Sequence, residues 1–408
     1  MKTLYGIREK VEDGTAVVLT AEEFKARVRE GERFAAADVD VVTCGTCGVM
    51  SGTAAIFSIP LAERGRFTRA SRIWLNKVPG FVGPCPNERL GLADLIVYAT
   101  AHGGAEYGGG HLFCDIVAGR EVEVIAETDA GRIERTVTRE DIPFARMMTT
   151  RSAYRNYLAM VNRRSTTVPT IFSVLGLRGP CLEASVSGCG EINPLENDPH
   201  MTTIRAGRRI LLNGAAGGVM GEGTRSTDEK PNLGAFADMA GMNPAYMGGF
   251  VTSGGPECWT SVAVPIPVLD DRQIAALSIL DEAIPLPIAD INDRLPFAES
   301  TYARVWRDTD PAVSVDPDAC IECEPCAAAA ACPGRAAAPG GGIDRDRCYA
   351  CGTCVAACPG GVYSCHLGTL PIAGREVPIT LRQSDRGRAL AICRDLKERM
   401  LDGRFSLL

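Results

Sequence analysis

The chain has 408 residues, of which 46% are hydrophobic, so it is long enough for two or three folded domains with a substantial core. Its formal net charge is −7 and its lysines and arginines form no concentrated patch, which excludes a general nucleic-acid-binding protein. The first residues contain no apolar signal-peptide core, and no run approaches the roughly 20 apolar residues that cross a membrane. We therefore expect a cytoplasmic protein that binds neither nucleic acid nor a membrane.

Seventeen cysteines are an unusual number for such a protein. The cytoplasm keeps thiols reduced, so a disulfide framework is not expected there. Metal binding or thiol chemistry is the better explanation for many of them, although a reduced cysteine is often only a small buried hydrophobic residue. We interpret Cys365 and Cys393 in that simpler way.

The first 43 residues predict a helix, a strand at 15–20, a second helix and a strand at 39–43. Thr20 and Glu23 have the spacing of a capping box at the start of the second helix. Alternating strands and helices are typical of an α/β sheet, in which functional residues gather in loops after the strand ends. We therefore predict an α/β main domain over residues 1–311, with the segment CGTCG (44–48) in such a loop.

Cys44 and Cys47 are the first candidate catalytic residues. Gly45 and Gly48 would let the backbone approach a ligand closely, and nearby amide groups would stabilise a thiolate in a cleft. Zinc binding by the pair is the alternative, and it requires two further ligands. The candidates for these ligands are Cys181, Cys189 and His111.

Further strands are predicted at 94–101, 121–128, 208–214 and 261–269, with Gly-rich stretches at 102–111 and 213–224. His111 closes the first stretch and is a candidate acid, base or ligand. The second stretch matches neither a dinucleotide-binding pattern nor a P-loop, and its consecutive amides suggest a nest for a small anion beside Arg225. The glycines of this predicted substrate-binding nest are Gly214, Gly217, Gly218, Gly221 and Gly223.

Residues 190–199, GEINPLENDP, are rich in turn formers and carboxylates. Such a segment is either an ordinary loop or a lid over a substrate. Glu191 is the carboxylate of this segment that we expect to move protons during catalysis.

The composition changes near Pro311. Residues 316–360 hold eight cysteines and little apolar material except alanine, which predicts a small separate module at 312–368. Residues 384–405 then have the pattern of an amphipathic helix, with Ser384 as its N-cap and Gly403 at its end. That helix needs a partner for its apolar face, so we expect residues 369–408 to return to the main domain and the module to be an insertion.

The eight cysteines of the module occur in two runs, CIECEPCAAAAACP (320–333) and CYACGTCVAACP (348–359). The second run has the ferredoxin spacing C-x2-C-x2-C-x3-C-P, in which three thiolates bind one iron-sulfur cluster and the fourth binds its neighbour. The first run has two extra residues before its last cysteine, about 3 Å of helical rise that a local bulge would absorb. The pattern predicts a small α+β ferredoxin-like domain with two [4Fe-4S] clusters. One cluster is bound by Cys320, Cys323, Cys326 and Cys358, and the other by Cys348, Cys351, Cys354 and Cys332.

Structural zinc is the alternative for these cysteines, because paired C-x-x-C motifs also form zinc ribbons. Two mirrored runs that each end in Cys-Pro favour clusters. A module with two clusters transfers single electrons and has no substrate chemistry of its own. Another part of the chain must therefore use the electrons.

Five segments together resemble the homocysteine-biosynthesis family, and more closely its branch of methanogenesis marker protein 16 metalloproteins. They are VDVVTCGTCGVMSGTAA (39–55), GGGHLFCDIVAGREVEV (108–124), GEINPLENDP (190–199), ILLNGAAGGVMGEGT (210–224) and LKERMLDGRFSL (396–407). The resemblance implies a reductive sulfur insertion of the kind that turns aspartate semialdehyde into homocysteine, with ferredoxin-type clusters as electron source. It also implies that the last helix belongs to the main domain.

The resemblance places an active-site cysteine in the Gly-rich segment after the early strand. Here Met50 and Ser51 stand where that cysteine would fall. Cys44 and Cys47 are therefore assigned the role only because they lie close to that position in the sequence. This difference favours a distinct substrate. The marker branch implies the methanogen thiol coenzyme M, whose aldehyde precursor would be sulfoacetaldehyde.

We therefore expect an iron-sulfur-dependent enzyme that converts a small anionic aldehyde into a thiol. Cys47 or Cys44 would carry sulfur as a persulfide or attack the aldehyde, His111 or Glu191 would move protons, and the glycine nest with Arg225 would hold the sulfonate or carboxylate. The expected partners are a sulfide or persulfide donor and an electron donor, and the chain could form a homo-oligomer. The alternatives are homocysteine formation, an electron-transfer subunit and a scaffold for metal or cluster assembly.

Overall fold

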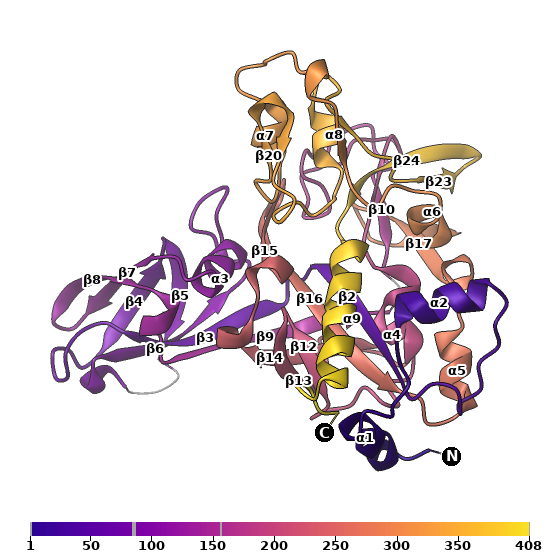
Figure 1. The fold of residues 1–408 in the computed structure, drawn as a ribbon. Helices are drawn as coiled ribbons and strands as arrows, with labels where there is room; N and C mark the ends of the chain where they lie inside the picture. The colour runs from indigo at the N-terminus through magenta and orange to yellow at the C-terminus, as the bar shows by residue number, and fades with distance from the viewer. Residues whose placement is uncertain (1, 84–86, 156, 408) are drawn as a thin grey trace.

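The computed structural model describes residues 2–83, 87–155 and 157–407, so Cys85 lies outside the described residues. Most strands belong to one large, strongly extended sheet (Figure 1). Its strands are β1 (Val18–Thr20), β2 (Val41–Val49), β3 (Thr53–Pro60), β4 (Ala70–Leu75), β5 (Val78–Val82), β6 (Leu92–Tyr98), β7 (Val122–Thr128), β8 (Gly131–Val137), β9 (Phe144–Tyr154), β12 (Arg209–Leu212), β13 (Ala215–Glu222), β14 (Asn232–Asp238), β15 (Gly248–Thr252) and β16 (Gly255–Pro267). Their spatial order is β1-β2-β16-β12-β13-β14-β9-β3-β6-β5-β4-β7-β8, with β15 paired to β16.

A second, smaller sheet has the order β18-β17-β10-β11-β24-β23. Its strands are β10 (Ala159–Val161), β11 (Ala184–Val186), β17 (Pro285–Asp290), β18 (Pro296–Thr301), β23 (Thr369–Ile372) and β24 (Arg375–Arg382). The pairs β1–β2, β10–β17 and β11–β24 are parallel, whereas the other pairs in both sheets are antiparallel. The fold is mixed α/β, and each strand that the sequence predicted overlaps an observed one.

The helices of the main domain are α1 (Leu4–Glu12), α2 (Ala21–Arg29), α3 (Gly109–Val117), α4 (Pro194–Asn197), α5 (Asp271–Leu277), α6 (Ala303–Trp306) and α9 (Arg386–Leu401). The predicted capping box is confirmed at α2, where Thr20 Oγ1 accepts from Glu23 N and Thr20 N donates to the Glu23 carboxylate. None of the helices in the described ranges is both long and apolar enough to cross a membrane.

Strand β2 corrects one prediction from the sequence. The segment CGTCG is not a loop after a strand but the middle of β2, where Cys44 pairs with Val264 and Cys47 with Ser261 of β16. A run of valine, threonine and cysteine suits a strand buried on both faces. Gly45 serves helix packing, since a Cβ there would lie 2.6 Å from Cys393 Sγ and clash with α9.

Helix α9 packs across β2 and β16 (Figure 1, yellow) and begins at Arg386 with Asp385 as its N-cap, one residue after the predicted cap. Its apolar face is buried, which satisfies the partner requirement that the sequence indicated. The buried residues of that face are Ala389, Ile392, Cys393, Leu396 and Met400. The C-terminal segment therefore completes the core around β2.

The cysteine-rich segment forms a small projection at one end of the molecule (Figure 1, orange). It contains α7 (Ala327–Ala331), α8 (Thr353–Ala357) and two short ribbons, β19 (Ser314–Val315) with β22 (Tyr363–Ser364) and β20 (Ala337–Ala338) with β21 (Gly342–Ile343). It has its own small core of Val313, Ala328, Ala337, Cys354, Val362 and Tyr363. The ferredoxin-like fold of this module and its exact boundaries stay predictions.

Candidate functional site

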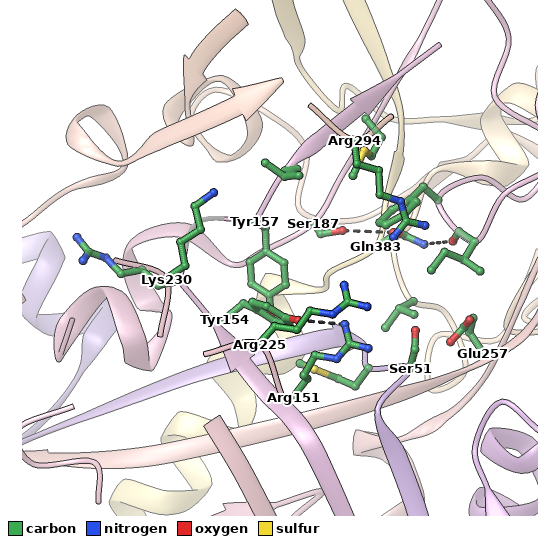
Figure 2. Close-up of a pocket in the computed structure, with 17 residues that line it drawn as sticks. Ser51, Arg151, Tyr154, Tyr157, Ser187, Arg225, Lys230, Glu257, Arg294 and Gln383 are labelled. Atoms are coloured by element: carbon green, nitrogen blue, oxygen red, sulfur yellow. Dashed lines mark hydrogen bonds between the residues drawn. The ribbon is translucent and has the colours of Figure 1, made fainter. Parts of the chain in front are cut away.

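A pocket of about 470 Å³ lies where the two sheets meet. The end of β2 is tied to the end of β24 there, because Val49 N donates to Gln383 O at 3.1 Å. Met50 and Ser51, in the turn after β2, form part of the lining together with residues of β9, β10 and β16. Figure 2 shows the polar side chains that surround this space.

The lining of the pocket is strongly basic. Its cationic side chains are Arg151, Arg155, Arg225, Lys230 and Arg294. Arg155 pairs with Glu196 at 3.5 Å, whereas the other four form no salt bridge within the described part of the chain. Unpaired cations in a partly enclosed space attract anions, because their charge is less screened than at an open surface. The pocket can therefore hold a small anion.

Glu257 of β16 is the carboxylate among the described lining residues. It is only 5% exposed, and its Oε2 is buried without a hydrogen-bond partner. Burial raises the pKa of this carboxyl, although a hydrogen bond from Ser51 and the charge of Arg151 oppose the shift. In Figure 2, Ser51 and Glu257 lie together at one side of the pocket. Sequence reasoning missed Glu257, because the predicted strand began at residue 261 and left the buried carboxylate outside it.

Arg225 lines the pocket, but the Gly-rich stretch before it is not a nest. Gly217 and Gly218 lie inside β13, whose backbone groups pair with β12 and β14. A Cβ on Gly217 would lie 2.0 Å from Phe236 O, so close strand packing explains this glycine. Gly214 and Gly221 have positive φ values of 85° and 131°, in the hairpin turn and at an irregularity of β13.

Gly223 follows β13, and its N–H donates to Asn232 O at 2.6 Å, so this amide is not free for an anion either. The predicted nest is therefore wrong in its geometry. The arginine beside it, and not the run of amides, reaches the pocket.

The thiols of Cys44 and Cys47 are wholly buried, so the prediction that they face a cleft is wrong. Cys47 Sγ accepts hydrogen bonds from Trp259 Nε1 at 2.9 Å and Ser261 Oγ at 3.0 Å. Burial raises the pKa of Cys44 to about 12 and that of Cys47 further, so both thiols are neutral at physiological pH. Neither lines the pocket, whereas Met50 and Ser51 do.

His111 lies in the first turn of α3 and does not line the pocket. Its Nδ1 accepts from Gly108 N at 3.3 Å, and its Nε2 is buried without a partner. Burial and the nearby charges of Arg335 and Arg347 lower its pKa to about 4, so the ring is neutral. It packs against Gly249 beside the module and away from the candidate substrate space.

Glu191 is fixed in an ion-pair network and does not line the pocket. Its carboxylate contacts Arg29 at 2.5 and 2.6 Å and Arg386 at 2.9 Å, and it accepts from Asp281 N. Burial opposes its ionisation, but these contacts outweigh burial and lower its pKa. The segment 190–198 is buried, so it is not a mobile lid over a substrate.

In the module, four cysteines line one small cavity: Cys332, Cys348, Cys351 and Cys354. These are the four thiols that the ferredoxin spacing assigns to one cluster. Backbone N–H groups of Ala336 and Ala337 point at Cys332 Sγ, at 3.2 and 3.4 Å. Similar contacts reach Cys348 Sγ from Ala350 N and Cys351 Sγ from Thr353 Oγ1, each at 3.4 Å. Hydrogen bonds to thiolate sulfur are a common means of tuning iron-sulfur clusters, so these residues fit such a group.

Among residues 2–83, 87–155 and 157–407, no three His, Cys, Asp or Glu side chains lie close enough together to bind a single metal ion. A four-iron cluster makes a different demand, because each thiolate binds a separate corner of the cube and the sulfurs stand apart. Cys320, Cys326 and Cys358 pack around the small core of the module. Cys323 belongs to the same segment and is only partly buried.

Two contacts connect the module to the main domain near the pocket. Arg382 N donates to Cys351 O at 3.0 Å, and the next residue, Gln383, lines the pocket. Tyr349, between two cysteines of the cavity, stacks on Trp259 with ring centroids 4.2 Å apart. Glu257 precedes Trp259 by two residues on β16. The four-cysteine cavity and the basic pocket are therefore neighbours.

The sequence pattern of a family described as "Homocysteine biosynthesis enzyme, sulfur-incorporation" matches residues 16–407. The chain belongs to this family. An uncharacterized protein of Methanothermobacter thermautotrophicus, 46% identical over 414 residues, aligns with 98% of this chain and 93% of its own length. The comparisons establish the family, whereas the marker branch stays a prediction. No solved structure matches the chain.

Two further relatives carry a named activity, L-aspartate semialdehyde sulfurtransferase. The one from Methanocaldococcus jannaschii is 33% identical over 74% of this chain and 62% of its own length. The one from Methanosarcina acetivorans is 30% identical over 71% of this chain and 58% of its own length. The chain therefore spans about three fifths of the length of these two sulfurtransferases.

Proposed function

We propose that this protein incorporates sulfur reductively into a small anionic aldehyde and releases a thiol. The family is one of sulfur incorporation, and two relatives are named for an aldehyde substrate. The observation that carries the proposal is the basic pocket, which holds Glu257 and lies next to the four-cysteine cavity. A single site thus combines anion binding, a proton source and proximity to candidate cluster ligands.

Sulfoacetaldehyde is the substrate that this lining favours. It carries a sulfonate and no ammonium group, so four unpaired cations suit it. Aspartate semialdehyde carries an ammonium group as well, which needs an anionic partner. Glu257 is the available carboxylate among the described lining residues, and burial disfavours its ionised form. Homocysteine formation is therefore the second candidate.

The electrons are proposed to come from two [4Fe-4S] clusters, one held by Cys332, Cys348, Cys351 and Cys354 and the other by Cys320, Cys323, Cys326 and Cys358. Such clusters supply electrons one at a time when bound. The chain itself determines where these cysteines lie relative to the pocket. The Cys351–Arg382 hydrogen bond and the Tyr349–Trp259 stack fix the module to two residues that are close in sequence to the lining residues Gln383 and Glu257.

Sulfur is proposed to arrive as sulfide or from the persulfide of a partner protein. No cysteine is found among the described residues that line the pocket. Cys44 and Cys47 are neutral and enclosed, and a persulfide on either would need space that the packed strand does not provide. The basic lining would also attract the hydrosulfide anion.

The test is thiol formation by protein reconstituted anaerobically with iron and sulfide and reduced with dithionite. We expect thiol from sulfoacetaldehyde and less from aspartate semialdehyde. Cys351→Ser should remove the EPR signal of the cluster beside the pocket and the activity while the signal of the second cluster remains. The control Cys365→Ser, outside both cluster sets, should retain both signals and the activity. Absence of thiol from either aldehyde, with reduction of a partner enzyme instead, would establish an electron-transfer subunit. Transfer of intact clusters to an apo-protein would establish an assembly scaffold.

A further inference from the structure

We infer that Glu257, beside Ser51 at one side of the pocket, is the residue that exchanges protons with the substrate. The inference rests on the proposed function for the identity of the reaction. It names a residue that neither the sequence motifs nor the relatives indicate.

The geometry sets Glu257 apart from the other acids and bases considered above. It lines the pocket, and only 5% of its surface is exposed. Its Oε2 has no hydrogen-bond partner in the described protein. A buried carboxyl oxygen without a partner is costly unless it is protonated or is met by a ligand. Glu191 is by contrast fully engaged by arginines, and His111 lies outside the pocket.

The charged and titratable groups that face Glu257 come from several elements. Arg151 of β9 is the one whose charge acts most directly on it, and the neighbouring Cys258 of β16 is a neutral buried thiol. The remaining cations of the lining are Arg155, Arg225, Lys230 and Arg294. An anion bound among these cations cancels part of their field at Glu257 and brings a negative charge close to it. Both effects favour the protonated carboxyl, so anion binding should be coupled to proton uptake.

The reaction balances with one carboxyl group. Addition of hydrosulfide to the aldehyde, with one proton taken up from water, gives a carbon that bears both OH and SH. The Glu257 carboxyl gives its proton to the hydroxyl, the C–O bond breaks, and water leaves. The C=S bond forms as the sulfur loses its proton to the Glu257 carboxylate, which restores the acid. Two electrons from the external reductant and two protons then convert C=S to CH–SH.

The first test does not require turnover. Calorimetry measures the binding of isethionate (2-hydroxyethanesulfonate) to the reconstituted protein in buffers of different ionisation enthalpy, which gives the number of protons taken up. The measurements are made at several pH values above 4.5, the ordinary pKa of a glutamate. We expect proton uptake on binding by wild type and by the exposed-site control Glu299→Gln. Glu257→Gln should bind isethionate without that uptake and should remain as heat-stable as wild type, because glutamine mimics the neutral acid.

Equal proton uptake in Glu257→Gln and wild type would overturn the inference. Failure of wild type to bind isethionate would overturn it as well, since the anion pocket is its premise. These results are independent of whether thiol is formed, so they separate failure of this inference from failure of the proposed reaction.

The second test uses the rate and its pH profile. General acid–base groups contribute roughly 10²- to 10⁴-fold, so Glu257→Gln should lower kcat by about a hundredfold or more. It should also abolish the fall in rate as pH rises through the carboxyl pKa. Glu257→Asp should restore part of kcat and part of this pH dependence. An unchanged kcat and pH profile in Glu257→Gln would overturn the role.

Discussion

The turn after β2 and the middle of the same strand present opposite environments only a few residues apart. Met50 and Ser51 open onto a basic pocket, whereas Cys44 and Cys47 are enclosed by β16 and α9. The cysteines attract attention in the sequence, yet burial makes them neutral thiols. The less conspicuous Met50 and Ser51 border the charged side chains and the open space that a reaction needs. Reactivity in this chain therefore follows access and charge more closely than residue type.

The strongest contrast between the two regions should appear when the charge of the pocket is removed. Arg225, whose φ is 64°, is replaced in Arg225→Gln by a shorter, neutral side chain that can still form hydrogen bonds. A hydrogen bond to a charged group contributes about 1.5–3 kcal/mol, so kcat/KM should fall about ten- to a hundredfold, mostly through KM. Steady-state kinetics with sulfoacetaldehyde measures this effect.

Arg132→Gln is the matched control for that experiment, because this arginine lies on the exposed strand β8 at the end of the large sheet. It should leave KM unchanged. A KM in Arg225→Gln equal to that of the control would show that the anion binds elsewhere.

Substitution of a buried thiol should lower the stability of the protein and leave its activity unchanged. Cys47→Ala removes the acceptor of Trp259 Nε1 and leaves that buried N–H unpaired, which should cost about 1–3 kcal/mol of unfolding free energy. Because the thiol does not reach the pocket, kcat should change less than twofold. Denaturant unfolding and thiol formation by the folded variant separate the two effects. Complete loss of activity in a well-folded Cys47→Ala protein would mean that the strand opens and the thiol is used after all.

Much of the fold was predictable because it depends on local patterns. The strands at β6, β7 and β12, the capping box of Thr20 and Glu23, and the apolar face of α9 all follow from residue spacing. The antiparallel course of the large sheet was not predictable in this way. It depends on pairing between distant segments, such as β2 with β16, which no local pattern encodes.

The candidate site likewise has features that local sequence patterns predict and features that depend on contacts between distant segments. Arg225 was found because it adjoins a conspicuous glycine run, although the glycines themselves serve the hairpin. The grouping of Cys332 with Cys348, Cys351 and Cys354 was predictable, since the motif spacing encodes it. Glu257 was not, because its significance comes from burial beside Ser51 and from the absence of a partner for Oε2 in the described protein. Both properties arise only when β16 packs against the turn after β2.

The smallest expected effect concerns Cys44 and alkaline pH. Its pKa is raised by burial from 9.0 to about 12, so the folded protein keeps the thiol proton that the unfolded chain loses above pH 9. The resulting stabilisation is fully present below pH 9 and declines as pH rises toward 12. The nearby buried Lys25 moderates the effect, since its charge lowers the pKa of Cys44. Unfolding free energy measured from pH 7 to pH 10.5 should therefore fall less steeply in Cys44→Ala than in wild type, with Cys181→Ala, a more exposed thiol, as the control. Parallel curves for wild type and Cys44→Ala would mean that this thiol has the same pKa in the folded protein as in the unfolded chain. The thiol would then ionise within the folded strand near pH 9, and the strand would have to be considered reactive.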